Sequence, residues 1–162
     1  MPIELRSTEA SEAWRAVMTA HTRVTELLAE EMAEETDITL DRYSVLLMLS
    51  QSEDGAMRPS DLADAIGLSR SGTTRLIDRL ETAGLVERRS CGEDRRGTFV
   101  GLTDSGADSF RRAGRVHLRG IEEHFGTHLT SDELADLDRI LSKLASSVGS
   151  EALAMVAPGG GR

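Results

Sequence analysis

The sequence predicts a mainly helical α+β fold in which a small β-hairpin follows a pair of short helices. Apolar residues recur at helical spacing over most of the chain, beginning with the stretch from Glu9 to Glu34. Two shorter helical patterns meet at Gly67. Directly after them, two runs of strand-forming residues, 85–89 and 98–102, enclose a polar turn.

The N-terminal helix is predicted to be unusually long, because neither Gly nor Pro interrupts its apolar stripe from Ala13 to Met32. About 25 residues at 1.5 Å each give a rod roughly 37 Å long. This exceeds what a small core needs, so we expect a helix shared with a second subunit. A surface helix of a larger monomer core is the alternative. The next helix, Leu40 to Ser50, is apolar nearly all round and is expected to be buried centrally.

A helix, a glycine-containing turn and a second helix are predicted next. Pro59 opens the first helix, with Ser60 as its expected cap, and Gly67 stands where a left-handed residue ends it. Ser69 is expected to cap the second helix, and Gly84 marks its end. This order of elements is the signature of a helix-turn-helix.

The second of these helices has two distinct faces. The buried face is predicted to consist of Thr73, Leu76, Ile77 and Leu80. The candidate DNA-binding residues on or beside the other face are Ser69, Arg70, Ser71, Thr74, Arg75 and Arg79. An Arg side chain forks onto guanine O6 and N7, and Ser and Thr reach base edges or phosphates, so this pattern favours a helix in the major groove. On this helix alone, an ordinary solvated basic face remains an alternative.

The hairpin adds a second basic feature at its tip. In the turn, 92–97, Arg95 and Arg96 follow Asp94 directly. An Arg at a hairpin tip enters an adjacent minor groove, whose negative potential attracts it. Asp94 is spaced to orient the guanidinium of Arg96 by a charge-assisted hydrogen bond. A basic hairpin directly after a helix-turn-helix predicts a winged helix-turn-helix, a DNA-binding module.

The distribution of charge agrees with this interpretation, although the whole chain has a net charge of −9. Residues 1–57 contain 4 basic and 12 acidic side chains, whereas residues 70–96 contain 7 basic and 5 acidic ones. A Debye length of about 8 Å lets local charge decide local binding. The net acidity nevertheless leaves an alternative open, namely a winged-helix protein-interaction module that does not bind DNA.

Three motifs resemble the multiple antibiotic resistance regulator (MarR) family. They are Leu80-Glu81-Thr82-Ala83-Gly84-Leu85-Val86-Glu87-Arg88-Arg89, Asp94-Arg95-Arg96-Gly97 and Leu102-Thr103-Asp104-Ser105-Gly106. The order of elements resembles that family from the long first helix to about Val148. The resemblance implies homodimeric regulators, mostly repressors that a small molecule releases from pseudo-palindromic DNA. It also implies wing contacts by Asp94 and Arg96 and recognition-helix contacts within 69–75.

The resemblance further implies one interwoven domain in which helices on both sides of the winged module dimerise. Beyond the hairpin, Thr103 is expected to cap a helix that runs to about Phe125, and Thr130 with Glu133 forms a capping box for the last helix. The expected parts are a dimerisation helix (1–38), the DNA-binding region (39–103), the C-terminal dimerisation helices (104–150) and a flexible tail (151–162).

The family resemblance also implies an effector, commonly a small aromatic anion. Its candidate pocket residues are Trp14, His21 and Tyr43. Read from the residues alone, an aromatic side chain on an apolar helical stripe more often belongs to the core. Both interpretations therefore stay open.

A metal- or redox-responsive regulator is a further alternative. Cys91, at the base of the wing, suits either an oxidation sensor or an incidental strand thiol. His117, His124 and His128 suit either a metal site or exposed and interface positions. The residue pattern favours the plainer interpretation in both cases, so we predict no metal and no cofactor.

Several classes of protein are not expected. The sequence has no P-loop, no dinucleotide-binding glycine motif, no HExxH and no nucleophile elbow, so we predict no enzymatic activity. No apolar run approaches 18 residues, and the first residues lack the pattern of a signal peptide. With Cys91 as the one cysteine, a reducing, cytoplasmic setting without membrane association fits best.

Overall fold

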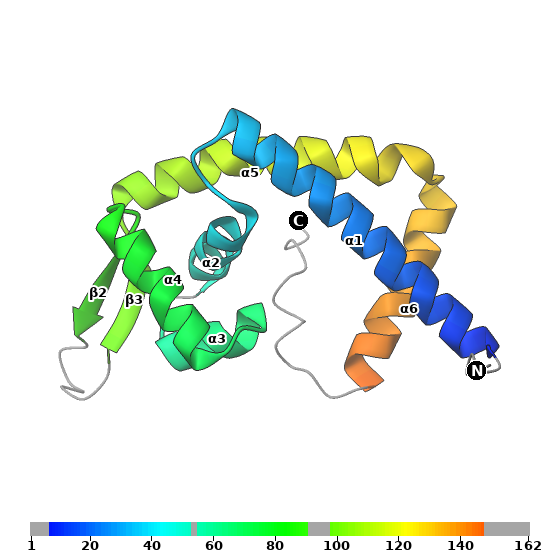
Figure 1. Ribbon diagram of the computed structural model, residues 1–162, viewed down its shortest axis with the longest axis horizontal. Helices are drawn as coiled ribbons and strands as arrows, with labels where there is room; N and C mark the ends of the chain where they lie inside the picture. The colour runs from blue at the N-terminus through cyan, green and yellow to red at the C-terminus, as the bar shows by residue number, and fades with distance from the viewer. Residues whose placement is uncertain (1–6, 53–54, 91–97, 148–162) are drawn as a thin grey trace, which may run out of the picture.

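The computed structural model describes residues 7–52, 55–90 and 98–147, and it confirms the mainly helical α+β, winged-helix fold (Figure 1). The helices are α1 (Glu9–Glu35), α2 (Leu40–Gln51), α3 (Pro59–Ile66), α4 (Arg70–Thr82), α5 (Asp104–His124), the short 3₁₀ helix η1 (Gly126–His128) and α6 (Ser131–Ser147). The strands are β1 (Ala56–Met57), β2 (Val86–Ser90) and β3 (Thr98–Leu102). The winged lobe, which comprises α2, α3, α4 and the three strands, lies at one end of the molecule and α6 lies at the other. The helices α1 and α5 cross between them (Figure 1).

The predicted long first helix is confirmed. It begins at a capping box in which the Thr8 hydroxyl accepts a hydrogen bond from Ser11 N, and the Ser11 hydroxyl accepts one from Thr8 N at 2.8 Å. Its 27 residues make a rod about 40 Å long. Much of this rod is exposed, and its C-terminal part packs on α5.

The helix-turn-helix is formed by α3 and α4, with one correction to the predicted caps. Ser60 is not the cap of α3, because Pro59 occupies the first helical position and leaves the preceding, extended Arg58 at the N-cap. Gly67 has φ 68°, as expected for the residue that ends this helix. Ser69 caps α4 by accepting a hydrogen bond from Gly72 N at 3.2 Å, and Gly84 follows with φ 71°.

The three strands form an antiparallel sheet in the order β1-β3-β2. Arg88 of β2 lies opposite Val100 of β3, and Ala56 of β1 lies opposite Gly101. The side chain of Val100 is buried, so β3 is the strand that joins the hairpin to the core. The two-residue β1 thus extends the hairpin to a sheet of three strands.

The core of the winged lobe surrounds α2, which is buried centrally as predicted. Its Leu46 and Leu49 are completely inaccessible and share one apolar cluster with residues of every other element of the lobe. The predicted inner face of α4 is confirmed, since Thr73, Leu76, Ile77 and Leu80 are all buried. The outer face of α4 must therefore point to solvent.

The opposite end of the molecule leaves large apolar side chains uncovered. On α1, α5 and α6 the exposed ones are Trp14, Val17, Met18, Leu27, Leu118, Ile140, Leu141 and Leu144. None of the described residues of α6 is buried within this chain. Among the described helices, none combines the length and apolar character that crossing a bilayer requires.

Candidate nucleic-acid interface

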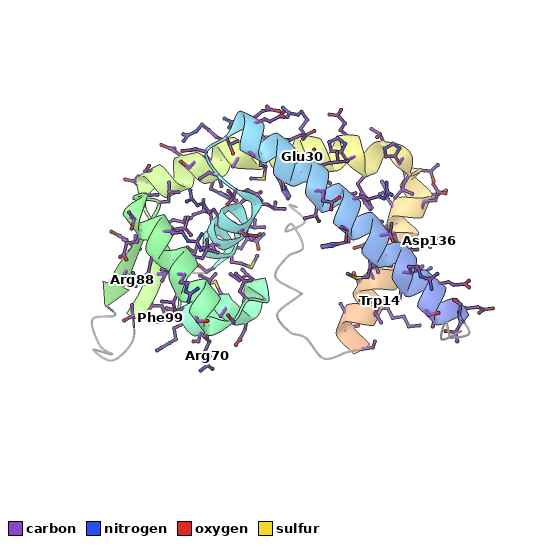
Figure 2. All side chains as sticks on the ribbon, in the orientation of Figure 1. Trp14, Glu30, Arg70, Arg88, Phe99 and Asp136 are labelled. Carbon is purple, nitrogen blue, oxygen red and sulfur yellow. The ribbon has the colours of Figure 1, made fainter. Side chains whose placement is uncertain are left out.

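The outer face of α4 presents all six predicted helix contacts to solvent. Ser69, Arg70, Ser71, Thr74, Arg75 and Arg79 are exposed. Within residues 7–52, 55–90 and 98–147, Arg70 and Arg75 form no ion pair. Figure 2 shows Arg70 at the winged end of the molecule, far from Trp14 and Asp136. Two exposed guanidinium groups without acidic partners on a firmly anchored helix are suited to bind phosphates or guanine edges.

The other polar side chains of this face are partly engaged by α4 itself. The Thr74 hydroxyl donates to the Arg70 carbonyl at 2.9 Å, and Arg79 Nε donates to the Arg75 carbonyl at 3.3 Å. The hydroxyls of Ser69 and Ser71 lie 3.3 Å apart. These contacts hold the side chains close to the helix. Among the described residues, Arg70 and Arg75 are therefore the arginines of α4 whose guanidinium groups remain unengaged.

Arg88 ties the base of the wing to α4, a role that the sequence analysis did not anticipate. Its Nη2 lies 2.6 Å from Asp78 Oδ1, it forms an ion pair with Glu81, and its backbone N donates to Glu81 Oε1 at 3.3 Å. The hydrogen bond to Asp78 and the charge of Glu81 raise the pKa of Arg88. A sequence signal was present, because Asp78 and Glu81 have the i, i+3 spacing of one helix face beside a basic strand.

Two further arginines contact β3. The guanidinium carbon of Arg58 lies 4.8 Å from the centre of the Phe99 ring, a cation–π contact between the start of α3 and β3. Arg89 is engaged within the hairpin, with Nε 2.7 Å from Glu87 and Nη2 donating to the Leu102 carbonyl at 3.1 Å. Arg88 and Phe99 lie at the same end of the molecule as Arg70 (Figure 2). Arg58 therefore adds a basic side chain near the wing that the sequence analysis had not selected.

The predicted contacts at the tip of the wing, Asp94, Arg95 and Arg96, lie outside the described residues, and so does Cys91. Their roles stay predictions. What the structure describes of the wing is its two strands, held to α4 through Arg88.

Comparison with known proteins decides the family. The sequence profile of the MarR family matches residues 36–97. MarR of Salmonella typhimurium is 30% identical over 108 residues, which cover 67% of this chain and 74% of that protein. AbsC, a MarR family transcriptional regulator from Streptomyces coelicolor, has 33% identity and a TM-score of 0.79, covering 90% of this chain and 98% of AbsC. The chain belongs to the MarR family.

A MarR-family structure with DNA is also similar. Sco3205 of Streptomyces coelicolor, solved in complex with DNA, is 26% identical with a TM-score of 0.79, covering 91% of this chain and 96% of that one. With two other curated relatives the match spans about half of their length, 46% and 58%. MarR-family members are transcriptional regulators, which confirms the predicted family and the prediction that this chain is not an enzyme.

The three predicted effector residues do not share one cavity in this MarR-family chain. Trp14 is 61% exposed on α1. Tyr43 is buried in the core, where its ring stacks on Phe110 at 5.4 Å and contacts His117 at 4.6 Å. His21 lines an apolar groove of about 390 Å³ between α1, α5 and α6, beside residues such as Leu137 of α6.

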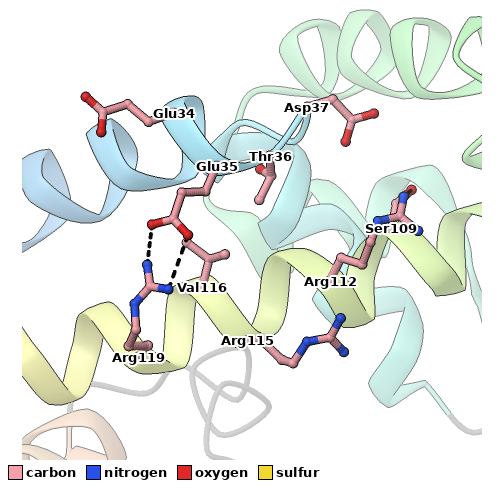
Figure 3. A pocket seen from close by; sticks show the side chains of 9 residues that line it. All are labelled: Glu34, Glu35, Thr36, Asp37, Ser109, Arg112, Arg115, Val116 and Arg119. Carbon is pink, nitrogen blue, oxygen red and sulfur yellow. Dashed lines mark hydrogen bonds and ion pairs between the residues drawn. The ribbon is translucent and has the colours of Figure 1, made fainter.

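A larger and more polar cavity, of about 810 Å³, lies where the end of α1 and the α1–α2 loop meet α5 (Figure 3). One wall carries Glu34, Glu35, Thr36 and Asp37, and the other Ser109, Arg112, Arg115, Val116 and Arg119. Two of its arginines are already engaged: Arg119 Nη1 donates to Glu35 at 3.2 Å, and Arg112 Nη2 donates to Ser109 Oγ at 2.9 Å. The sequence analysis did not identify this cavity, because its walls come from segments about 80 residues apart.

The three histidines considered as a metal site do not converge. His117 is packed against Tyr43, and this burial lowers its pKa. His128 is exposed on η1. His124 instead contacts Glu31 of α1, with Nε2 2.6 Å from Oε1. Within the described residues, His124 therefore meets carboxylates and not the other two histidines.

Proposed function

We propose that the chain is a homodimeric transcriptional regulator that binds pseudo-palindromic double-stranded DNA and represses by occluding a promoter. The observation that carries the proposal is the pair Arg70 and Arg75, exposed and without acidic partners among the described residues, on a helix whose other face is locked into the core. The similarity to Sco3205, which was solved with DNA, supports it. Such a protein acts in the cytoplasm, the setting expected from the sequence.

In this proposal α4 of each subunit enters the major groove, and the wing enters the neighbouring minor groove. Two α4 helices related by a two-fold axis read half-sites about 34 Å apart. Arg95 and Arg96 supply the minor-groove contacts, with Asp94 orienting Arg96. The region 39–103 thus binds DNA.

The segments 1–38 and 104–150 hold the two subunits together in this proposal. Support comes from the exposed apolar side chains of α1, α5 and α6, which a monomer leaves in water. A face of this kind in a chain whose relatives bind DNA favours dimerisation through these helices.

Release by a small aromatic anion is the last part of the proposal. Of the predicted pocket residues, His21 has the most suitable surroundings, an apolar groove between three helices, and Trp14 belongs to the same helix. Tyr43 packs in the core against Phe110 and His117. Its proposed role is therefore to transmit effector binding to α2 and not to contact the effector.

The test is a gel-shift and fluorescence-anisotropy titration with DNA from upstream of the protein's own gene. We expect Arg96→Ala to weaken binding by about 1–3 kcal/mol and Arg75→Ala to relax the preference at particular base pairs. Arg139→Ala is the control, since Arg139 is exposed but lies on α6. An absence of any shift by the wild type at low salt would favour the protein-interaction alternative. A uniform loss over all sequences for Arg75→Ala would assign that side chain to phosphate alone.

A further inference from the structure

Three side chains with metal-binding atoms meet where α1 passes the C-terminal end of α5. They are Glu31 of α1 and the neighbouring Glu123 and His124 of α5, and one ligand atom from each lies within 4.8 Å of the others. The side chains of Glu31 and His124 are only 22% and 18% exposed. The cluster differs from a surface patch of acids, because it combines an imidazole nitrogen with two carboxylates across two helices.

One oxygen of this cluster lacks a partner. Glu31 Oε1 contacts His124 Nε2 at 2.6 Å, but Glu31 Oε2 is inaccessible to solvent and accepts no hydrogen bond from the described residues. The guanidinium of Arg119 is 4.0 Å away and already paired with Glu35. A buried, charged acceptor without a hydrogen-bond donor is costly. This oxygen is therefore available to bind a cation.

The backbone of α5 makes the room that this carboxylate needs. Gly120 lies one turn before His124, and a Cβ placed on it would come within 2.6 Å of Glu31 Oε2. The glycine thus lets the carboxylate lie directly against α5. His124 contacts the other oxygen of this carboxylate, Oε1, at 2.6 Å.

We propose that Glu31, Glu123 and His124 bind one first-row divalent cation, for which Zn²⁺ is the best match. Zn²⁺ accepts both imidazole nitrogen and carboxylate oxygen as ligands, and a site with three protein ligands keeps a fourth position for water. Tetrahedral Zn²⁺ with bonds of about 2.0–2.1 Å holds its ligand atoms about 3.4 Å apart. The three ligand atoms lie within 4.8 Å of one another, which is near that spacing.

The cation replaces the hydrogen bond between Glu31 and His124 with two metal–ligand bonds. The bonds join α1 to α5, which are the two helices that connect the winged lobe to the rest of the chain (Figure 1). The proposal does not depend on DNA binding.

The test is isothermal titration of Zn²⁺ into the metal-stripped full-length chain without DNA. We expect one Zn²⁺ per chain in the wild type and in the control His128→Ala, whose histidine is exposed on η1. Glu31→Gln keeps the shape of the side chain and a hydrogen bond to His124, yet it should lower the affinity by at least about tenfold. His124→Ala should do the same.

Glu123→Gln keeps the proposal testable if the Glu31 or the His124 variant unfolds, because Glu123 is exposed. Circular dichroism checks the fold of each variant. The proposal is wrong if the wild type binds no Zn²⁺, or if folded Glu31→Gln and Glu123→Gln bind it as tightly as the wild type. Since no DNA is present, either result leaves the proposed regulator function intact.

Discussion

The side chain of Arg88 shows that a basic residue in a DNA-binding segment is not always available to DNA. Residues 70–96 contain seven basic side chains. Two of them, Arg88 and Arg89, form ion pairs with Asp78, Glu81 and Glu87. The structure thus divides the positive charge into a part that holds the wing in position and a part, on α4, that remains available.

Replacing Arg88 by Gln is expected to lower the free energy of unfolding by up to about 1 kcal/mol, because two partly exposed ion pairs between β2 and α4 are lost. Arg111→Gln is the matched control: its ion pair with Asp108 lies within α5 alone and joins no two elements. Urea denaturation measures both. Equal losses of unfolding free energy in the two variants would show that the contact between the wing and α4 adds no more stability than an ion pair within one helix.

The buried His117 predicts a pH dependence of stability. Burial lowers the pKa of His117 in the folded chain, so the unfolded chain binds the proton more readily. The stability that neutral His117 contributes is fully present above about pH 6.5, the pKa of a histidine in the unfolded chain. It is lost as the pH falls from that value through the folded pKa. His117→Phe retains the ring contact with Tyr43, and it should lose less stability than the wild type between about pH 7.5 and about pH 5.5. Parallel urea midpoints for both proteins over this range would exclude His117 as the cause.

Among the elements, α5 depends on a glycine at its first turn. A Cβ on Gly106 would overlap the backbone carbonyl of Leu85, the residue that precedes β2. The Thr103 hydroxyl caps α5 by accepting from Gly106 N at 2.9 Å and donates to the Gly84 carbonyl at 2.7 Å. The end of the helix-turn-helix and the start of α5 are therefore packed backbone against backbone.

Gly106→Ala is expected to destabilise the fold by about 1–3 kcal/mol, because the overlap with Leu85 outweighs the gain in helix propensity. Gly114→Ala supplies the control within the same helix. Its Cβ would meet Tyr43 only at an ordinary 3.5 Å, so the substitution should be neutral or stabilise by about 0.5–1 kcal/mol. Thermal or urea unfolding measures both variants. Destabilisation by both alike would mean that the contact with Leu85 is not the reason.

The elements that the sequence predicted correctly are those defined by short-range chemistry. Ser69, Thr103 and Thr130 act as caps, or in a capping box, through partners three residues away. Ser60 failed as a cap because Pro59 competes for the same helix start. Arg88 was missed although its partner Asp78 is only 10 residues away, and other missed contacts join distant segments: 93 residues separate Glu31 from His124. No periodicity encodes a side-chain pairing of that kind, so the ion pairs and cavities of the structure had to be observed.

At the scale of the whole molecule, one end buries most of its large apolar side chains and the other leaves many of them exposed. The winged lobe buries its apolar residues, whereas Ile140 and Leu144 of α6 remain 52% and 49% exposed. Family membership and the division of α4 into a buried and an exposed face were accessible from the sequence, because they depend on contiguous motifs. The way in which α1, α5 and α6 meet was not, since amphipathic helices alone do not specify their partners.

Leu144→Asp is expected to convert the proposed dimer into a monomer, because a dimer interface would have to bury the new carboxylate. DNA affinity should fall with it, since one winged lobe reads one half-site. Ala135→Asp adds the same charge to an exposed position on another face of α6 and should leave the dimer intact. Size-exclusion chromatography with light scattering measures the assembly. A monomeric wild type, or a dimeric Leu144→Asp, would contradict the proposed arrangement.

The uninterrupted run of α5, from the base of β3 to η1, has a mechanical consequence. Its 21 residues form a stiff lever about 31 Å long, with the winged lobe at one end and α6 at the other. Tilting such a lever by about 5° displaces its far tip by nearly 3 Å. A minor adjustment among α1, α5 and α6 is therefore amplified at α4. In the proposed dimer, a few ångströms there decide whether two α4 helices still fit successive grooves.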